Sequence, residues 1–131
     1  WRADKGLSEN EFSNERRSVV LAIRNMEALG LTGGVIKLDG KIKAFTIGER
    51  LRKDIQLIHI EKADADINGL FPMINQQYVL HECQDVEYIN REEDMGVEGK
   101  KKKKRSYCPD YMVKKYFAAK GKLTRQELSV E

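Results

Sequence analysis

The segment Gly33-Gly-Val-Ile-Lys-Leu-Asp-Gly-Lys-Ile-Lys-Ala-Phe-Thr-Ile-Gly48 decides the fold class. Asp39-Gly40 lies between two extended runs, which is the strongest short-range signal for a β-hairpin. The second run is apolar or β-branched on both faces at residues 44–47, so we expect it to be a central strand. Gly48 closes this run, and a glycine there indicates a β-bulge or a close approach of another backbone.

The segments on either side of this hairpin alternate between helical and extended patterns. Ser8 and Glu11 form a capping-box signature, and apolar residues then recur at helical spacing, which predicts a helix over residues 9–29 that ends at Gly30. This order excludes a helical bundle and predicts an α/β (α+β) fold in which helices flank a mixed sheet. The remaining predicted elements are a strand over 56–61, a helix over 68–83, a strand over 86–90, a short helix over 97–105, and a last strand or short helix over 111–119.

Composition limits the class of protein. The chain has 131 residues, 40% of them hydrophobic and 34% charged, which is typical of one soluble domain. No apolar run approaches the roughly 20 residues that a membrane helix needs. Cys83 and Cys108 lack the spacing of a metal site, so we expect no metal and two reduced, structural cysteines in a cytoplasmic domain. Because the first residue is Trp1, we expect a fragment of a longer protein.

The charge is unevenly distributed. The net charge is only +3, but Lys100 to Arg105 are six consecutive cations, and the rest of the chain is slightly acidic. Such a run suits an anionic partner, such as a tRNA backbone or an anionic lipid headgroup, although most charge runs are simply solvated faces. Lys101, Lys102 and Lys104 are the predicted contacts. No aromatic residues are interleaved with them, which argues against sequence-specific reading of nucleic acid.

Several long blocks of the sequence resemble one family over residues 8–118. The chain is similar to the C-terminal domain of the phosphatidylglycerol lysyltransferase-like proteins, a domain of unknown function with a GNAT-type acyltransferase fold. The blocks that carry this resemblance are Asp39-Gly40-Lys41, Ala44-Phe45-Thr46-Ile47-Gly48-Glu49, His59-Ile60-Glu61-Lys62-Ala63-Asp64, Ile74-Asn75, Tyr88-Ile89-Asn90-Arg91-Glu92-Glu93-Asp94-Met95-Gly96, Ser106-Tyr107 and Pro109.

The resemblance implies a GNAT-like mixed β-sheet over residues 1–119. The tail over 120–131 has little apolar content, so we expect it to be loosely ordered. The resemblance also implies two GNAT-like halves in tandem, of which this chain is the second and the N-terminal half is its missing partner. The implied function is acyl or aminoacyl transfer to an amine or hydroxyl acceptor when both halves are joined. The alternative is a non-catalytic scaffold or an anion-binding interaction module, so whether this half is an enzyme stays open. The implied location is cytoplasmic, at the inner face of the membrane if the full-length protein has membrane helices.

The sequence departs from its relatives in two places. The turn after the 56–61 strand differs from that of acetyl-CoA-using GNAT proteins, and the lysine run differs from the nearer relatives. The turn at Lys62 to Gly69 carries Asp64 and Asp66 where a glycine-rich, diphosphate-binding turn would lie. We expect an aspartate to cap the following helix, which disfavours acetyl-CoA in this half and leaves aminoacyl-tRNA, another acyl-CoA or no donor as the alternatives, with no bound cofactor. The lysine run is also more basic than the mixed helix of the relatives.

The predicted site is centred on the polar cluster that follows the strand at 86–90. Glu92 or Asp94 would hold an ammonium group, or Arg91 would clamp a carboxylate or phosphate; a structural ion-pair knot is the alternative. His59 and Glu61 are two apart on one strand, so they would share a face and act as base and orienting group, unless His59 is a core histidine. The predicted catalytic set is His59, Glu61, Asn90, Arg91, Glu92 and Asp94, and the predicted substrate-binding set is Lys62, Asn75, Lys101, Lys102, Lys104 and Tyr107. For Asn75 and Tyr107 a packing role competes with ligand contact, and Lys62 would either pair with Asp64 or reach a phosphate.

Overall fold

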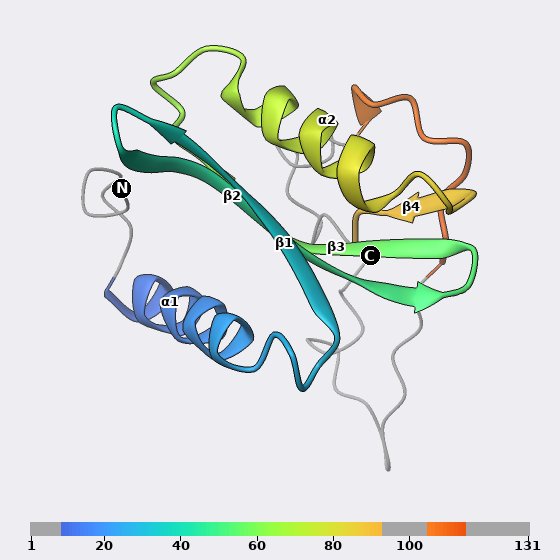
Figure 1. Cartoon of the computed structure of the whole chain (residues 1–131), viewed down its shortest axis with the longest axis horizontal. Helices are drawn as coiled ribbons and strands as arrows, with labels where there is room; N and C mark the ends of the chain where they lie inside the picture. The colour runs from blue at the N-terminus through green and yellow to red at the C-terminus, as the bar shows by residue number, and fades with distance from the viewer. Residues whose placement is uncertain (1–8, 93–104, 115–131) are drawn as a thin grey trace, which may run out of the picture. The chain divides into compact units, whose positions relative to one another are not determined.

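The structure is a computed structural model that describes residues 9–92 and 105–114. The chain divides into two compact units between Glu92 and Glu93. Every helix and strand with bounds given below belongs to the first unit, and they follow the chain in the order α1, β1, β2, β3, α2, β4 (Figure 1).

The hairpin predicted from Asp39-Gly40 is confirmed. β1 spans Leu31–Leu38 and β2 spans Lys41–Arg52, and the two strands pair antiparallel up to Leu38 opposite Lys41. Asp39 and Gly40 have φ angles of 51° and 73°. Positive φ at both central residues is what a type I′ turn requires, and this turn matches the twist of the strands it joins.

The strands form one mixed sheet in the order β1-β2-β3-β4. β3 spans Ile55–Ala63 and pairs antiparallel with β2, while β4 spans Tyr88–Asn90 and pairs parallel with β3. β2 is therefore central, as its two-sided apolar pattern predicts. α2, at Leu70–Glu82, lies across one face of the sheet, and α1, at Glu9–Arg24, lies by the other face (Figure 1). The predicted α+β class is confirmed.

The core lies between α2 and the sheet. One buried cluster joins Ala44 and Ala63 of the strands to Leu70 and Ile74 of α2, and a second joins Ile58 to Tyr78 and Cys83. Tyr78 is also tied to the sheet through its hydroxyl, which lies 2.8 Å from both Thr32 Oγ1 and Gln56 Nε2. Burial of large apolar side chains, each contributing about 1.5–3 kcal/mol, is what holds α2 on the sheet.

A β-bulge in β3 changes which residues face α2. Ile47 is opposite Ile60 and Gly48 is opposite Ile58, so His59 is the extra residue. Before the bulge Gln56 and Ile58 contact α2, and after it Glu61 and Ala63 do. Strict alternation is broken at His59, because two residues of a bulged strand oppose one residue of its neighbour.

Three predictions about the helices and strands need correction, and others fall on residues outside the described ranges. α1 ends at Arg24 rather than Leu29, and a turn continues to Gly30, which does have the predicted left-handed φ of 63°. The predicted cap of α2 is wrong: the helix begins after Gly69, which makes no side-chain cap, and Asp64 instead pairs with Lys43 Nζ at 3.0 Å. Residues 111–114 carry no regular element. The predicted helix at 97–104, residues 115–119 and the tail at 120–131 lie outside the described residues.

The two cysteines have different surroundings. Both are free thiols; Cys83 is buried in the core, whereas Cys108 is exposed in the second unit. Burial raises the pKa of the Cys83 thiol above 9.0. The structural role predicted for both cysteines therefore fits the buried Cys83. It does not fit the exposed Cys108.

Candidate functional site

The site forms where the parallel strands β3 and β4 separate. Their last pair is Leu57 with Asn90, and β3 continues to Ala63 without β4 beside it. The Oδ1 of Asn90 accepts a hydrogen bond of 2.9 Å from the Glu92 N–H, and Glu92 has a φ of 58°. This side-chain turn ends the strand, since an asparagine oxygen bonded two residues on mimics a backbone turn. Arg91 and Glu92 then reach back to β3.

Arg91 binds β3 on the face that α2 covers. Its Nη2 donates to Glu61 Oε1 at 2.9 Å, and Asn75 Nδ2 of α2 donates to Glu61 Oε2 at 3.3 Å. The Glu61 side chain is only 8% exposed and that of Arg91 is 22% exposed. Both oxygens of a nearly buried carboxylate are thus satisfied, which is the condition for keeping such a charge in the interior.

Glu92 binds β3 through His59. The Nδ1 of His59 lies 2.5 Å from Glu92 Oε1, and its Nε2 lies 3.0 Å from Glu49 Oε1. Partial burial lowers the pKa of His59, but the hydrogen bonds to Glu49 and Glu92 outweigh it, so the pKa is raised above 6.5. A protonated imidazole donates to both carboxylates at once, and the three groups together then carry one net negative charge.

We refer to Glu49, His59, Glu61, Arg91 and Glu92 as the strand-gap cluster. Of the predicted site residues, the structure brings together His59, Glu61, Asn75, Asn90, Arg91 and Glu92. The expected pairing of His59 with Glu61 on one face is wrong. The bulge at His59 shifts the alternation, so Glu61 contacts α2 while His59 contacts Glu49 and Glu92.

The other predicted residues lie apart from this cluster or outside the described residues. Lys62 Nζ forms an ion pair with Glu15 of α1. Tyr107 belongs to the second unit, where its side chain is 37% exposed. Asp94, Lys101, Lys102 and Lys104 lie outside the described residues.

Glu49 is the member of the cluster that sequence reasoning missed. It stands directly after Gly48 in the strand block, where it reads as an ordinary solvent-facing residue. Its contact with His59 depends on the bulge, because the extra residue brings the His59 ring toward β2. The glycine at 48, read as a bulge marker, was the one signal that pointed to an irregularity here.

Proteins with similar sequences identify the family of this chain. The sequence of residues 1–119 matches the family model described as phosphatidylglycerol lysyltransferase, C-terminal. The chain belongs to this family. A crystal structure of a conserved protein of unknown function from Bacteroides thetaiotaomicron is similar, with 42% sequence identity and a TM-score of 0.74. The match covers 85% of this chain and 36% of that one. Among curated proteins, none matches significantly. In the part of the chain that the structure describes, no helix has the length and apolar content to cross a membrane.

Proposed function

We propose that the chain is an acyl- or aminoacyl-transferase-like domain, with the GNAT-type organisation expected from the resemblance. Joined to its other half, it would transfer an amino acid or acyl group to an amine or hydroxyl acceptor. The family's description supports this reaction class. The observation that carries the proposal is the strand-gap cluster, where a parallel strand pair separates beside acidic side chains. Ligand sites in α/β sheets commonly form at the carboxyl ends of parallel strands.

Glu92 is the group we assign to the acceptor. An amine arrives as an ammonium ion and must lose a proton before it attacks a carbonyl carbon. The Glu92 side chain is 38% exposed, whereas that of Glu61 is 8% exposed, so Glu92 is the more accessible carboxylate. The amine nitrogen then bonds to the acyl carbon, the donor's ester or thioester bond breaks, and the proton passes to the departing oxygen or sulfur.

His59 and Arg91 are assigned positioning roles. Both ring nitrogens of His59 are hydrogen-bonded to carboxylates, and its raised pKa favours the protonated form, which cannot accept a proton. His59 therefore orients Glu92 rather than acting as the base. Arg91 holds Glu61 and, being next in sequence to Glu92, fixes the backbone that carries the acceptor-binding carboxylate.

The donor is proposed to be aminoacyl-tRNA or an acyl-CoA other than acetyl-CoA. No aspartate caps α2, so only negative charge disfavours acetyl-CoA here. The carboxylates of Asp64 and Asp66 precede the helix where a diphosphate would approach. Calorimetric titration of the 131-residue chain with acetyl-CoA checks this, and low-micromolar binding would contradict it.

The proposed activity needs both halves. The chain covers 36% of its structural relative, so we expect the remaining sequence to supply groups that position the substrates. Positioning is worth roughly 7–11 kcal/mol of a reaction barrier. We therefore expect the 131-residue chain alone to show no transfer from aminoacyl-tRNA or acyl-CoA, and robust turnover by it would count against the two-half proposal.

A non-catalytic scaffold is the second candidate, and one observation favours it. Each ionised side chain of the strand-gap cluster is paired with another member of that cluster. Structural ion-pair networks show the same arrangement without any chemistry.

The test compares Glu92→Gln with Glu87→Gln in a longer family protein that carries this sequence as its C-terminal region. Labelled amino acid or acyl groups are supplied on tRNA or CoA, with amine and hydroxyl acceptors, lipid headgroups included. We expect Glu92→Gln to lower turnover by about 10²-fold or more while the protein remains folded at the assay temperature. Glu87→Gln is the matched control, because its side chain is exposed and outside the cluster. Full activity of Glu92→Gln would contradict the catalytic proposal and favour the non-catalytic scaffold.

A further inference from the structure

The His59 ring bridges two carboxylates that come from different parts of the sheet. Its Nε2 lies 3.0 Å from Glu49 Oε1 of β2, and its Nδ1 lies 2.5 Å from Glu92 Oε1 beyond β4. An ionised carboxylate accepts hydrogen bonds and cannot donate them. The bridge therefore needs an N–H on each ring nitrogen, and only the imidazolium form of the ring has both.

Loss of one proton from the ring must break one of these two hydrogen bonds. The neutral ring has one donor nitrogen and one acceptor nitrogen, so one of the carboxylates would face a lone pair. The contact with Glu92 is the shorter one, and the short charge-assisted hydrogen bonds are the strong ones. We therefore expect the remaining proton to stay on Nδ1, and the contact between Nε2 and Glu49 to open.

The Glu49 side chain can move away from the ring without disturbing the sheet. Its backbone is held opposite Leu31 of β1 and Leu57 of β3, and its side chain is 30% exposed, so a change of rotamer brings the carboxylate into water. The turn after β4 keeps its support, because Glu92 still accepts from the ring and Asn90 still accepts from the Glu92 N–H. The opening is thus local to the ring and one side chain.

We propose that the His59 bridge is a pH-dependent switch on the strand-gap cluster. The protonated ring holds both carboxylates, and loss of its proton releases Glu49 to join Glu92 as a second carboxylate for an incoming ammonium group. The three groups then carry two negative charges instead of one, which strengthens their attraction for a cation. The inference rests on the proposed function, because that function assigns the acceptor's ammonium group to Glu92.

Among the described residues, the charged groups that face the ring are these two carboxylates. Glu49 comes from β2 and Glu92 from the turn after β4, whereas Glu61 of β3 is turned toward Arg91 and toward Asn75 of α2. Partial burial lowers the pKa of the ring, but the hydrogen bonds to both carboxylates outweigh it and raise that pKa above 6.5. The opening is therefore moved toward neutral pH, where a histidine responds to small changes in acidity.

The switch makes the ring proton and a bound ammonium group compete. A ligand that binds only the neutral-ring state must weaken proton binding by the same factor by which the proton weakens the binding of the ligand. Well below the ring pKa, the fraction of neutral ring falls tenfold for each pH unit. The apparent Kd for an amine should therefore rise by about tenfold for each unit there.

NMR of the His59 ring in the 131-residue chain tests the switch. Long-range proton–nitrogen correlation spectra report which ring nitrogens carry protons. We expect both nitrogens to be protonated at low pH and Nδ1 alone above the ring pKa. Addition of n-butylammonium chloride should lower the ring pKa, whereas tetramethylammonium chloride, with the same charge but no N–H, should not. Loss of the proton from Nδ1 instead of Nε2, or equal effects of the two salts, overturns the proposal.

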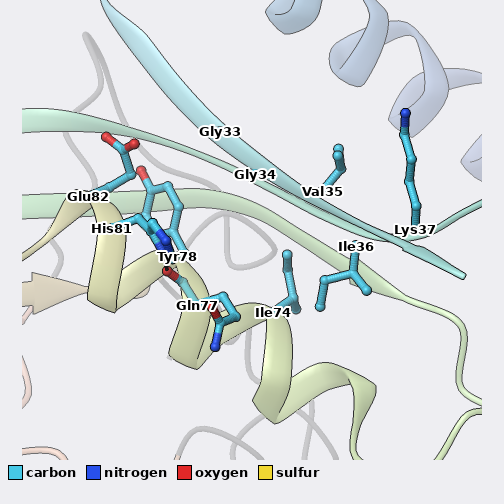
Figure 2. A pocket seen from close by; sticks show the side chains of 10 residues that line it. All are labelled: Gly33, Gly34, Val35, Ile36, Lys37, Ile74, Gln77, Tyr78, His81 and Glu82. Atoms are coloured by element: carbon cyan, nitrogen blue, oxygen red, sulfur yellow. Dashed lines mark hydrogen bonds between the residues drawn. The ribbon is translucent and has the colours of Figure 1, made fainter.

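A groove between β1 and α2 supplies the matched control for the amine. Its volume is about 530 Å³, and Figure 2 shows His81 and Glu82 together at one end of it. An amine that simply seeks carboxylates would also bind at Glu82, and the His81 ring would report this. Glu82→Gln should leave the effect of the amine on His59 unchanged, whereas Glu49→Gln should remove most of it. Equal effects of the two substitutions would count against the switch.

His59→Gln removes the titrating group and keeps both carboxylates. Amine binding is followed through the backbone amide signals of Glu49 and Glu92, and the dispersion of the same spectra shows that each variant is folded. In the wild type, the apparent Kd at pH 6 should exceed that at pH 8 by roughly fivefold or more, because the neutral ring is the minor form at the lower pH. In His59→Gln the two values should agree within about twofold. A wild-type pH dependence in His59→Gln would overturn the proposal.

The switch and the proposed reaction can fail separately. None of these readouts measures group transfer, so a ring that never opens contradicts the switch and leaves the reaction standing. Unchanged turnover of Glu92→Gln in a longer family protein contradicts the reaction, whatever the ring does.

Discussion

The hydroxyl of Tyr78 in α2 lies where a side chain at position 48 of β2 would have to be. A Cβ on Gly48 would come within 2.5 Å of Tyr78 Oη and would also meet the backbone oxygen of Leu57. The ring is not free to withdraw, because its hydroxyl is bonded to Thr32 and Gln56 at 2.8 Å each. Gly48 is therefore required by close packing at the β2–β3 bulge.

Gly48→Ala is expected to destabilise the fold. Overpacking of a tight site costs about 1–3 kcal/mol, and the backbone contact with Leu57 leaves little room for relaxation. Urea denaturation followed by circular dichroism measures the free energy of unfolding. Gly34→Ala is the control, since a Cβ there meets only Thr46 Cγ2 at 3.9 Å, an ordinary contact. Equal losses in the two variants would show that the Tyr78 contact is not the cause.

Arg91→Met is expected to lower the free energy of unfolding by about 1–3 kcal/mol. Removing one partner of a fully buried pair costs about 3–5 kcal/mol, and the 22% exposure of Arg91 reduces that figure. A double-mutant cycle with Glu61→Gln isolates the coupling. Arg52→Met is the matched control, because Arg52 pairs with Asp54 at 3.4 Å with its side chain 65% exposed, and we expect a change within about 0.5 kcal/mol. No coupling in the cycle would contradict this assignment.

Titration of His59 should be shifted to higher pH. Its pKa is raised above 6.5 in the folded chain, so its stabilising effect is complete below 6.5 and is lost as pH rises through the folded pKa. NMR titration of the ring should give a pKa above 6.5 that falls in Glu49→Gln and in Glu92→Gln, the two groups that face it. The stability difference between wild type and His59→Gln should shrink from pH 6 to pH 9. A His59 ring pKa that is the same in both variants as in the wild type would refute this account.

The lysine run should bind anions electrostatically. Changing Lys101, Lys102 and Lys104 to Gln should weaken binding to tRNA and to anionic vesicles. If three or four cations contact phosphates, the log–log salt slope should be roughly −2 to −4. The control changes three dispersed, exposed lysines, Lys37, Lys41 and Lys53, to Gln, for the same loss of charge. If the variant at Lys101, Lys102 and Lys104 kept wild-type affinity at low salt, the lysine run would be a solvated face without a binding role.

Local patterns predicted most of the fold. The Asp39-Gly40 turn, the central β2 and the 68–83 helix each follow from residues within one short window, and each is confirmed with bounds shifted by a few residues. The end of α1 was less predictable. The helical spacing of apolar residues continues past Arg24, but the chain must turn to enter β1, as the bond from the Leu31 N–H to the Met26 oxygen shows.

The candidate site was only partly predictable because it depends on contacts between distant segments. The sequence places His59, Glu61, Arg91 and Glu92 in one predicted set, but it does not indicate that Arg91 pairs with Glu61 and Glu92 with His59. Arg91 and Glu61 are thirty residues apart in sequence and Glu92 and His59 thirty-three. Which face each occupies depends on a bulge in β3 that no local pattern at His59 announces.

The turn at Asn90 constrains the length of its segment more than the identity of its residues. Arg91 and Glu92 serve opposite faces of the sheet because each occupies a fixed number of positions after the last β3–β4 pair. Inserting one residue between Asn90 and Arg91 would place the guanidinium beside His59 and the inserted residue beside Glu61, and would carry the glutamate one position beyond its contact with His59. Relatives can therefore vary the charges here by paired substitution, but insertions and deletions in this segment should be rare among them.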